Sequence, residues 1–380
     1  MWKIIAHSRV RYPPFESSLK NPENLPIVDR EVELASSVED LDLELSRLPA
    51  AVKIGSDDSW IIERKIIAID SEGVRKNITH SSSLDERNFP PIVMEQRIGW
   101  YLSPDPIHAA SRKWITFAVI YLLAVLFYQF IEPIILFLGI IEKPLGSIQI
   151  GILDYPLMIV TVVPLMLLPI ILRITANLRD LKQQRMFLSS KPMKPTVKFH
   201  NDPISDSPLT GSIRIPNPRD DWEGMSVSWR AGVLPPAREA ILEAHGVREG
   251  DQPPPGLSTP LPHYWGSGLS DGTGIGEEIP VEIHEVKGGL FLRPMRISET
   301  GGAQELPISG GDFKIEPPSG DWPGSQSGSF VRIHWELMIQ INRTKKQPLF
   351  WLLPLRVRHG EGPFVINEIS IKDGRIEESK

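Results

Sequence analysis

The chain has 380 residues and a net charge of −6, and its composition is 41% hydrophobic and 23% charged. It contains no cysteine, which excludes disulfides, thiolate zinc sites, iron–sulfur clusters and thiol nucleophiles. The acidic balance gives no indication of nucleic-acid binding. A chain of this length has room for two soluble domains and a membrane segment, which is the organisation that we expect.

The first 112 residues predict a small soluble part. Residues 1–27 are proline-rich and are expected to be extended. Leucines at helical spacing in 38–48 follow Ser36, and Glu39 completes the pattern of a capping box, so this stretch predicts a helix. The run WIIERKIIAID (60–70) predicts a strand or hairpin. We therefore expect a small α+β domain over 28–112, with Asp57 and Asp58 in a solvated loop.

Two apolar runs follow, at 114–141 and 157–174. The first contains a single charge, Glu132, and the second contains none before Arg173. Because a helix rises ~1.5 Å per residue, about 20 apolar residues cross a hydrocarbon core of about 30 Å. Both runs are long enough, and the sequence predicts a transmembrane helical hairpin over 113–174.

The charges that flank these runs predict their orientation. Arg112 and Lys113 precede the first run, and the connection between the runs holds a single basic residue, Lys143. The second run ends in a basic stretch, which contains Arg173, Arg179, Lys182, Arg185, Lys191, Lys194 and Lys198. By the positive-inside rule both termini are expected to face the cytoplasm, in an integral protein of the cell membrane.

Two end points are possible for the first predicted helix, because Pro133 directly follows Glu132. Either the helix continues past a kink to Ile141, or it ends near Ile131 and 134–152 lies in the outer interface. An intramembrane Glu is a functional candidate by default. The alternative interpretation places Glu132 at the headgroup boundary, which the length of the helix permits.

Residues 175–195 predict a basic helix that extends the second run into the cytoplasm. Its leucines keep helical spacing, with bases between them, up to the SSKP sequence. Basic side chains beside a membrane attract anionic lipid head groups, and the candidates are Arg173, Arg179, Lys182 and Arg185. An equally open interpretation is that these basic residues only set the membrane topology.

From residue 196 the hydrophobic period changes to two, which is typical of strands with one buried face. The clearest cases are 225–233, 331–341 and 349–357, and shorter candidates lie at 213–215, 281–283, 290–292, 313–315 and 365–371. A helix is expected at 237–246 and a long loop at 248–262. We therefore predict an all-β antiparallel sandwich of the immunoglobulin-like class over 196–380.

Residues 312–357 resemble the end of an arrestin N-terminal lobe. That family has a short strand, a proline-containing segment, a Ser/Gly pair before a long aromatic-bearing strand, a turn and a final strand. Residues that occupy these places are Phe313, Pro317, Pro318, Ser327, Gly328, Trp335 and Pro354 to Val357. The resemblance covers about an eighth of the chain and suits one lobe, without the family's phosphate-sensing residues. It implies a non-enzymatic module that recruits membrane proteins.

Four aromatic residues in turn-rich segments are the best candidates for partner binding: Trp222, Tyr264, Trp265 and Trp322. The alternative is that each ring packs over an end of the sandwich. We expect a scaffold or adaptor at the inner membrane face that binds a cytoplasmic protein or the tail of a membrane protein, without a cofactor. A subunit of an oligomeric transporter or channel is the alternative. An enzyme would require His284, His334 and carboxylates in one pocket.

Overall fold

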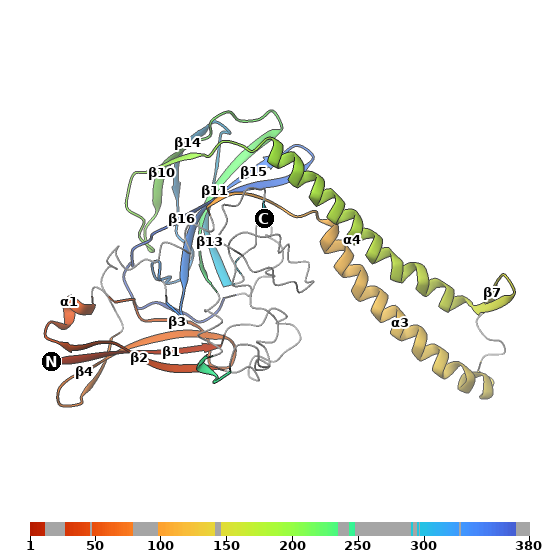
Figure 1. The fold of residues 1–380 in the computed structure, drawn as a ribbon, viewed down its shortest axis with the longest axis horizontal. Helices are drawn as coiled ribbons and strands as arrows, with labels where there is room; N and C mark the ends of the chain where they lie inside the picture. Colours follow the sequence, from red (N-terminus) through yellow and green to blue (C-terminus); the bar gives the residue numbers. More distant parts are fainter. Residues whose placement is uncertain are drawn as a thin grey trace. The chain divides into compact units, whose positions relative to one another are not determined.

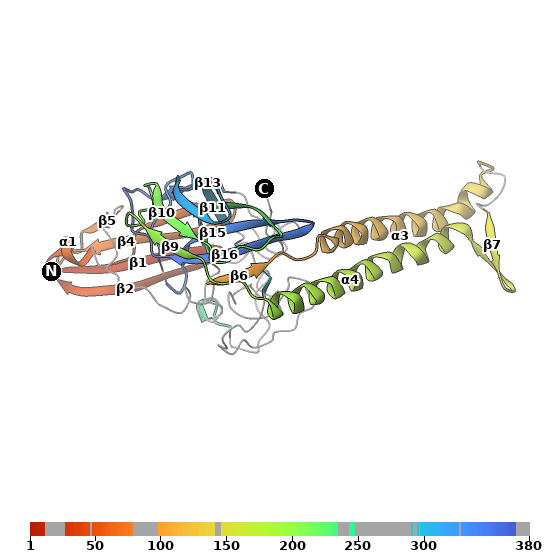
Figure 2. The same cartoon turned by 90° about the horizontal axis from the view of Figure 1, so that it is seen from above.

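The computed structural model describes residues 1–11, 27–45, 48–78, 98–140, 146–234, 243–247, 290–291, 295, 297–326 and 328–369. The chain forms two compact units. One comprises Met1–Ser103 together with Lys191–Lys380, and the other is Pro104–Ser190. Figures 1 and 2 show the sheets of the first unit and the two long helices of the second from two directions.

The N-terminal part of the first unit is a mostly antiparallel sheet in the order β17-β3-β4-β1-β2, with β5 beside β4. Its strands are β1 (Trp2–Arg11), β2 (Val28–Val38), β3 (Val52–Gly55), β4 (Ile61–Ile69), β5 (Arg75–Ile78) and β17 (Val365–Ile366). The strand expected at 60–70 is β4. Residues 2–11, expected to be merely extended, instead form β1 between β4 and β2.

One face of this sheet carries its own core. The even positions of β1 and β4 are buried, because successive side chains of a strand point to opposite faces. Helix α1 (Leu41–Leu45) packs against them through Leu45. The helix expected over 38–48 is therefore shorter than predicted: Ser36 belongs to β2, and the Asp40 carboxylate accepts the Leu43 N–H at 3.1 Å instead.

The rest of the first unit contains two further sheets. The larger has the order β12-β6-β16-β15-β11-β13, and the smaller has the order β14-β10-β9. The strands are β6 (Gly99–Leu102), β9 (Thr196–Phe199), β10 (Leu209–Arg214), β11 (Trp222–Val233), β12 (Leu290–Phe291), β13 (Ile297–Leu306), β14 (Gly310–Ile315), β15 (Ile333–Arg343) and β16 (Lys346–Leu355). All pairings within them are antiparallel except that of β12 with β6.

Alternating apolar residues form the core of these two sheets, as the period of two predicts. Trp229 on β11 and Trp335 on β15 are both fully buried, with ring centroids 4.9 Å apart. Each indole N–H donates to a backbone carbonyl, Trp229 to Glu316 at 2.6 Å and Trp335 to Pro323 at 2.9 Å. The rings therefore bury large apolar area and leave neither N–H without an acceptor.

Strands cross the predicted domain boundaries in both directions. β6, from the N-terminal half of the chain, pairs with β16 through Trp100 and Trp351. β17, from the C-terminal half, pairs in parallel with β3 of the N-terminal sheet. The Lys53 N–H also donates to the Phe364 carbonyl at 3.0 Å. Each of the two sheets is thus completed by a strand from the other side of the two apolar helices in the sequence.

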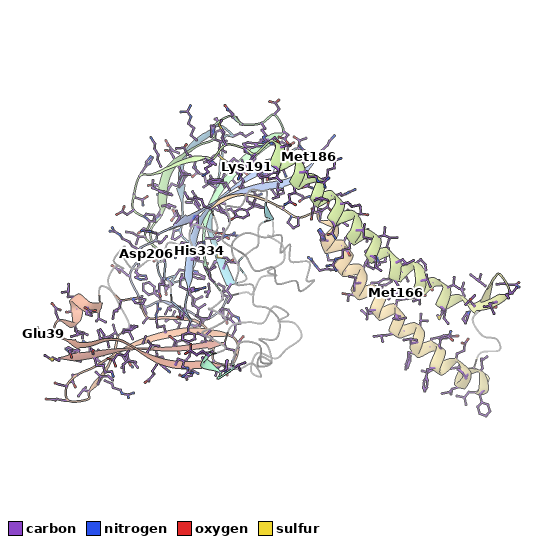
Figure 3. All side chains as sticks on the ribbon, in the orientation of Figure 1. Glu39, Met166, Met186, Lys191, Asp206 and His334 are labelled. Atoms are coloured by element: carbon purple, nitrogen blue, oxygen red, sulfur yellow. The ribbon has the colours of Figure 1, made fainter. Side chains whose placement is uncertain are left out.

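The second unit is a pair of long helices, α3 (Ile107–Phe137) and α4 (Leu157–Ser189). Both are long and apolar enough to cross a membrane, and only 6% of each apolar window is buried. Figure 3 shows side chains on all sides of the pair, with Met166 labelled on α4. Helix α3 continues past Pro133 for one turn, and α4 runs unbroken into the basic region. The connection contains the hairpin β7 (Ser147–Ile150) and β8 (Leu153–Pro156).

Candidate functional site

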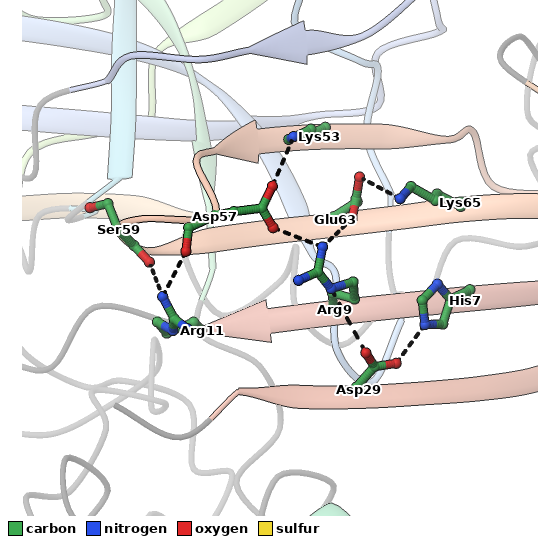
Figure 4. A network of polar contacts seen from close by, with 9 residues as sticks. All are labelled: His7, Arg9, Arg11, Asp29, Lys53, Asp57, Ser59, Glu63 and Lys65. Atoms are coloured by element: carbon green, nitrogen blue, oxygen red, sulfur yellow. Dashed lines mark hydrogen bonds and ion pairs between the residues drawn. The ribbon is translucent and has the colours of Figure 1, made fainter. Parts of the chain in front are cut away.

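The solvent-facing side of the N-terminal sheet carries a dense network of charges, which Figure 4 shows from close by. We call this network the charged face. Cross-strand register places its members opposite one another, since Arg9 on β1 lies between Asp29 on β2 and Glu63 on β4. Its members are His7, Arg9, Arg11, Asp29, Lys53, Asp57, Glu63 and Lys65.

Arg9 is the centre of the charged face. Its guanidinium lies 2.8 Å from an Asp57 oxygen, 3.5 Å from Glu63 and 3.8 Å from Asp29. His7 contacts the other Asp29 oxygen at 2.5 Å. Basic and acidic groups therefore neutralise one another here, and the charged face holds the strands and the β3–β4 hairpin in register rather than presenting charge of one sign.

The β3–β4 hairpin is fixed from both sides. Arg11 donates to the backbone carbonyls of Asp57 and Ser59, each at 2.9 Å. Gly55 has a φ of +87°, and a Cβ there would lie 2.1 Å from the Trp60 carbonyl oxygen. Only glycine fits this combination of left-handed backbone and close approach. The loop between the two strands is therefore a defined surface.

This hairpin forms one wall of an open pocket of about 360 Å³, which we call the hairpin groove. The opposite wall is the stretch of chain that follows β17. The lining residues are Gly55, Ser56, Ser59, Trp60, Asn367, Glu368 and Ile369. Because its two walls are more than 300 residues apart in the sequence, as Gly55 and Asn367 show, sequence patterns gave no signal for this groove.

Arg9 and Asp57 shift the pKa values of each other. The hydrogen bond from Arg9 lowers the pKa of Asp57 below its usual range, and the charges of Arg9 and Lys53 add to this effect. Partial burial acts to lower the pKa of Arg9, but the hydrogen bond and charge of Asp57 and the charges of Glu63 and Asp29 outweigh it and raise the pKa. Both groups stay ionised at neutral pH.

The Asp57→Asn variant is expected to lose stability in a pH-dependent way. Because the folded-state pKa of Asp57 is depressed, its contribution is complete above the unfolded pKa of ~3.9 and is lost as the pH falls through the lower folded value. The melting temperature of the wild type should exceed that of the variant by a constant amount above about pH 5. The difference should vanish in stronger acid. Asp58→Asn, an exposed neighbour, is the control.

The larger C-terminal sheet contains a buried ionic cluster. Arg230 donates to one Glu336 oxygen at 2.5 Å, and His334 lies 3.1 Å from the other. All three side chains are almost completely buried, with His334 4% exposed. His334 and Glu336 lie at even positions of β15, so the prediction that this strand has only one buried face was wrong. The outer face of this sheet is also covered, as buried Tyr101, Phe350 and Leu352 show.

Arg64 is a second buried cation that the sequence did not single out. It lies on the core face of β4, where its Nε and Nη2 groups donate to the Ala50 carbonyl at 3.2 and 3.1 Å. Burial lowers its pKa to about 10. The IIERKII run does not indicate that Arg64 is enclosed, because the three-dimensional packing decides which charge of a strand is buried.

The structure buries two of the four aromatic candidates for partner binding. Trp222 is 5% exposed and packs beside Trp100, with ring centroids 6.0 Å apart. Trp322 is 2% exposed, and its indole N–H donates to Glu299 at 3.1 Å. Neither ring is available to a partner here, in agreement with the alternative that such rings pack over the sheets. Tyr264 and Trp265, like the expected loop 248–262 and His284, lie outside the described residues.

A polar cluster joins the two helices of the second unit near the start of α3. Asp180 on α4 accepts the Asp105 backbone N–H at 2.9 Å and contacts His108 Nε2 at 2.8 Å. Asp105 itself caps the helix by accepting the Ile107 N–H at 2.9 Å. These three residues are each less than 8% exposed. The cluster therefore holds the start of α3 against α4.

The basic candidates all lie on α4, where Arg179, Lys182 and Arg185 are exposed. Arg179 is also 3.7 Å from Asp105. Glu132 on α3 accepts a hydrogen bond from the Tyr128 hydroxyl at 3.4 Å, one turn earlier on the same helix. Further along the pair, the Tyr121 hydroxyl contacts the Thr161 hydroxyl of α4 at 2.6 Å. Polar groups within the apolar spans thus interact with one another.

Among the described residues, no three His, Asp or Glu side chains are grouped in a way that suits a metal ion. Comparison of the chain with known proteins finds neither a matching family model nor a matching curated protein.

Proposed function

We propose that this protein is a membrane-anchored binding module whose soluble parts lie at the cytoplasmic face. The observation that carries this proposal is the exposed apolar surface of α3 and α4, most of which contacts nothing in the described part of the chain. Hydrocarbon is the environment that such a surface requires. The basic residues of α4 support the cytoplasmic orientation and can contact anionic head groups.

The hairpin groove is the binding site that we assign to this module. Its hydroxyl, amide and carboxylate groups, together with the apolar Trp60 and Ile369, suit an extended peptide segment. Glu368 is exposed and supplies the one charged group of the lining, so a basic side chain of the partner would pair with it. β17 is the last strand of its sheet, which leaves an edge along which an extended segment could lie.

The arrestin-like character of the C-terminal sheets belongs to the same proposal. Within 312–357 the chain forms β14, the proline segment, the long strand β15 with Trp335, a turn and β16, in the order that the resemblance implies. A module of this kind recruits membrane proteins without catalysing a reaction. The alternative, an oligomeric transporter or channel subunit, draws its support from Glu132 and Tyr128, and it requires several hairpins to enclose a pathway.

A photo-crosslinking amino acid at position 367 tests the groove and the orientation together. In intact cells, we expect Asn367 replaced by p-benzoylphenylalanine to form an adduct with a partner protein. The charge reversal Glu368→Lys should abolish this adduct, because it places a cation where the partner's basic group would lie. Glu361→Lys, a reversal at another exposed position of the same segment, should leave it unchanged.

Two outcomes would contradict the proposal. An adduct that survives Glu368→Lys, or no adduct at all, removes the groove as the binding site. An adduct formed with a protein segment on the outer side of the membrane removes the cytoplasmic orientation.

A further inference from the structure

The hairpin between the two helices, β7 and β8, is amphipathic. Its strands pair so that Ile148 lies opposite Tyr155, and Gly151 and Ile152 form a two-residue turn. Because side chains alternate along a strand and paired residues share a face, Ile148 and Tyr155 lie on one face, and Gln149 lies on the other. The hairpin therefore has one apolar face and one polar face.

The apolar side chains of this hairpin are exposed. Ile152 at the turn is 96% exposed, Leu153 56%, Ile148 41% and Tyr155 38%. A two-stranded hairpin on its own is marginally stable in water, and its stability requires something that covers the apolar face. The described residues of the helical unit do not provide this cover.

The hairpin is continuous with the apolar surface of the helices. β8 ends at Pro156, α4 begins at Leu157, and the Leu157 N–H donates to the Gly146 carbonyl at 2.9 Å, which closes the base of the hairpin. Phe137 at the end of α3 is 90% exposed. The same medium that covers the ends of the helices therefore reaches the hairpin.

The open edges of the hairpin limit how deep it can lie. Among the described residues each strand pairs on one side only, which leaves backbone N–H and C=O groups that need water. Such edges do not occur in lipid-exposed positions within the hydrocarbon core. The headgroup boundary satisfies both requirements, since it offers acyl chains to Ile148 and water to the edges, and Tyr is enriched at this level.

We propose that the β7–β8 hairpin is an interfacial element that binds the lipid surface, with the face of Ile148 and Tyr155 in contact with the acyl chains and Gln149 toward water. This inference rests on the proposed insertion of α3 and α4. It assigns a second membrane contact, on the opposite side of the bilayer from the soluble parts, where the hairpin sets the depth of the two helices.

Because the chain has no cysteine, single introduced cysteines can carry a nitroxide spin label at chosen positions. The full chain is placed in phosphatidylcholine vesicles, and collision rates with oxygen and with a water-soluble nickel chelate are measured for each label. We expect a higher oxygen-to-nickel ratio for Ile148→Cys and Tyr155→Cys than for Gln149→Cys. Leu123→Cys, at the centre of α3, should give the highest ratio and serves as the control for insertion.

Three outcomes would overturn the inference. If Leu123→Cys shows a high ratio while positions 148, 149 and 155 are all equally accessible to nickel, the helices insert and the hairpin does not bind lipid. If position 123 is also accessible to nickel, both the insertion and the hairpin proposal fail. If label 148 is shielded from both reagents and its spectrum shows dipolar broadening, a second copy of the chain covers this face instead of lipid.

Discussion

Replacing Glu336 by alanine is expected to lower the free energy of unfolding by about 3–5 kcal/mol, the usual cost of removing one partner from a buried ion pair. Glu336 is completely buried and accepts from Arg230 at 2.5 Å, while its second oxygen contacts His334 at 3.1 Å. Without the carboxylate, the positive charge of Arg230 stays enclosed between β11 and β15. Unfolding of the intact protein in detergent micelles, followed by tryptophan fluorescence, measures this loss.

A matched control separates the charge from the packing. Replacement of the whole cluster by apolar residues (Arg230→Met, His334→Leu and Glu336→Leu together) should cost much less than Glu336→Ala alone, because the buried cations are removed together with the carboxylate. The single substitution Gln340→Ala, at a half-exposed position of the same strand, should have little effect. A triple variant as unstable as Glu336→Ala would contradict the prediction that an enclosed charge explains the loss.

Replacing Trp322 by alanine is expected to cost about 3–5 kcal/mol of stability, the range for truncating a buried Trp. The ring is 2% exposed, and its N–H donates to Glu299. Had Trp322 been a surface residue for partner binding, the same change would weaken binding and leave stability within about 0.5 kcal/mol. A buried ring therefore predicts a large loss of stability for Trp322→Ala, a surface ring predicts almost none, and one unfolding measurement distinguishes them.

Trp322→Phe provides the control for this prediction. Phenylalanine keeps most of the apolar area and loses only the hydrogen bond to Glu299, so its cost should be clearly smaller than that of alanine. A melting temperature unchanged in both variants would contradict the burial of this ring.

The period of two in the sequence predicted the strands that form the centre of the sheets. β11, β15 and β16 carry long alternating apolar series, and they lie where expected. β13 was missed, since ISETGGAQEL has two glycines and few apolar residues, and its pairing with β11 comes from the sheet and not from propensity. β1 was missed for a related reason: its WKIIAHSRVR sequence places charges on alternate positions near a proline-rich stretch.

The candidate sites were harder to predict than the strands, because burial depends on partners distant in sequence. The positions of Trp222 and Trp322 in turn-rich segments were compatible with surface rings and with packed rings, and packing against residues distant in sequence decides that both are buried. The period of two predicted one buried face for β15, yet His334 and Glu336 on its other face are enclosed as well. The hairpin groove combines Gly55 and Glu368, two positions that no local spacing relates.

The exchange of β6 and β17 has a consequence for how the molecule is made. During synthesis, β6 emerges before the two apolar helices, and its partner β16 emerges long after them. β3 likewise waits for β17 to complete its sheet. If the helices insert as we propose, both edges stay unpaired while the helices enter the bilayer, and unpaired edges favour wrong pairing during that interval. On this proposal insertion comes first and closure of both sheets comes last, so a chain interrupted before residue 346 would be anchored while each sheet still lacked a strand.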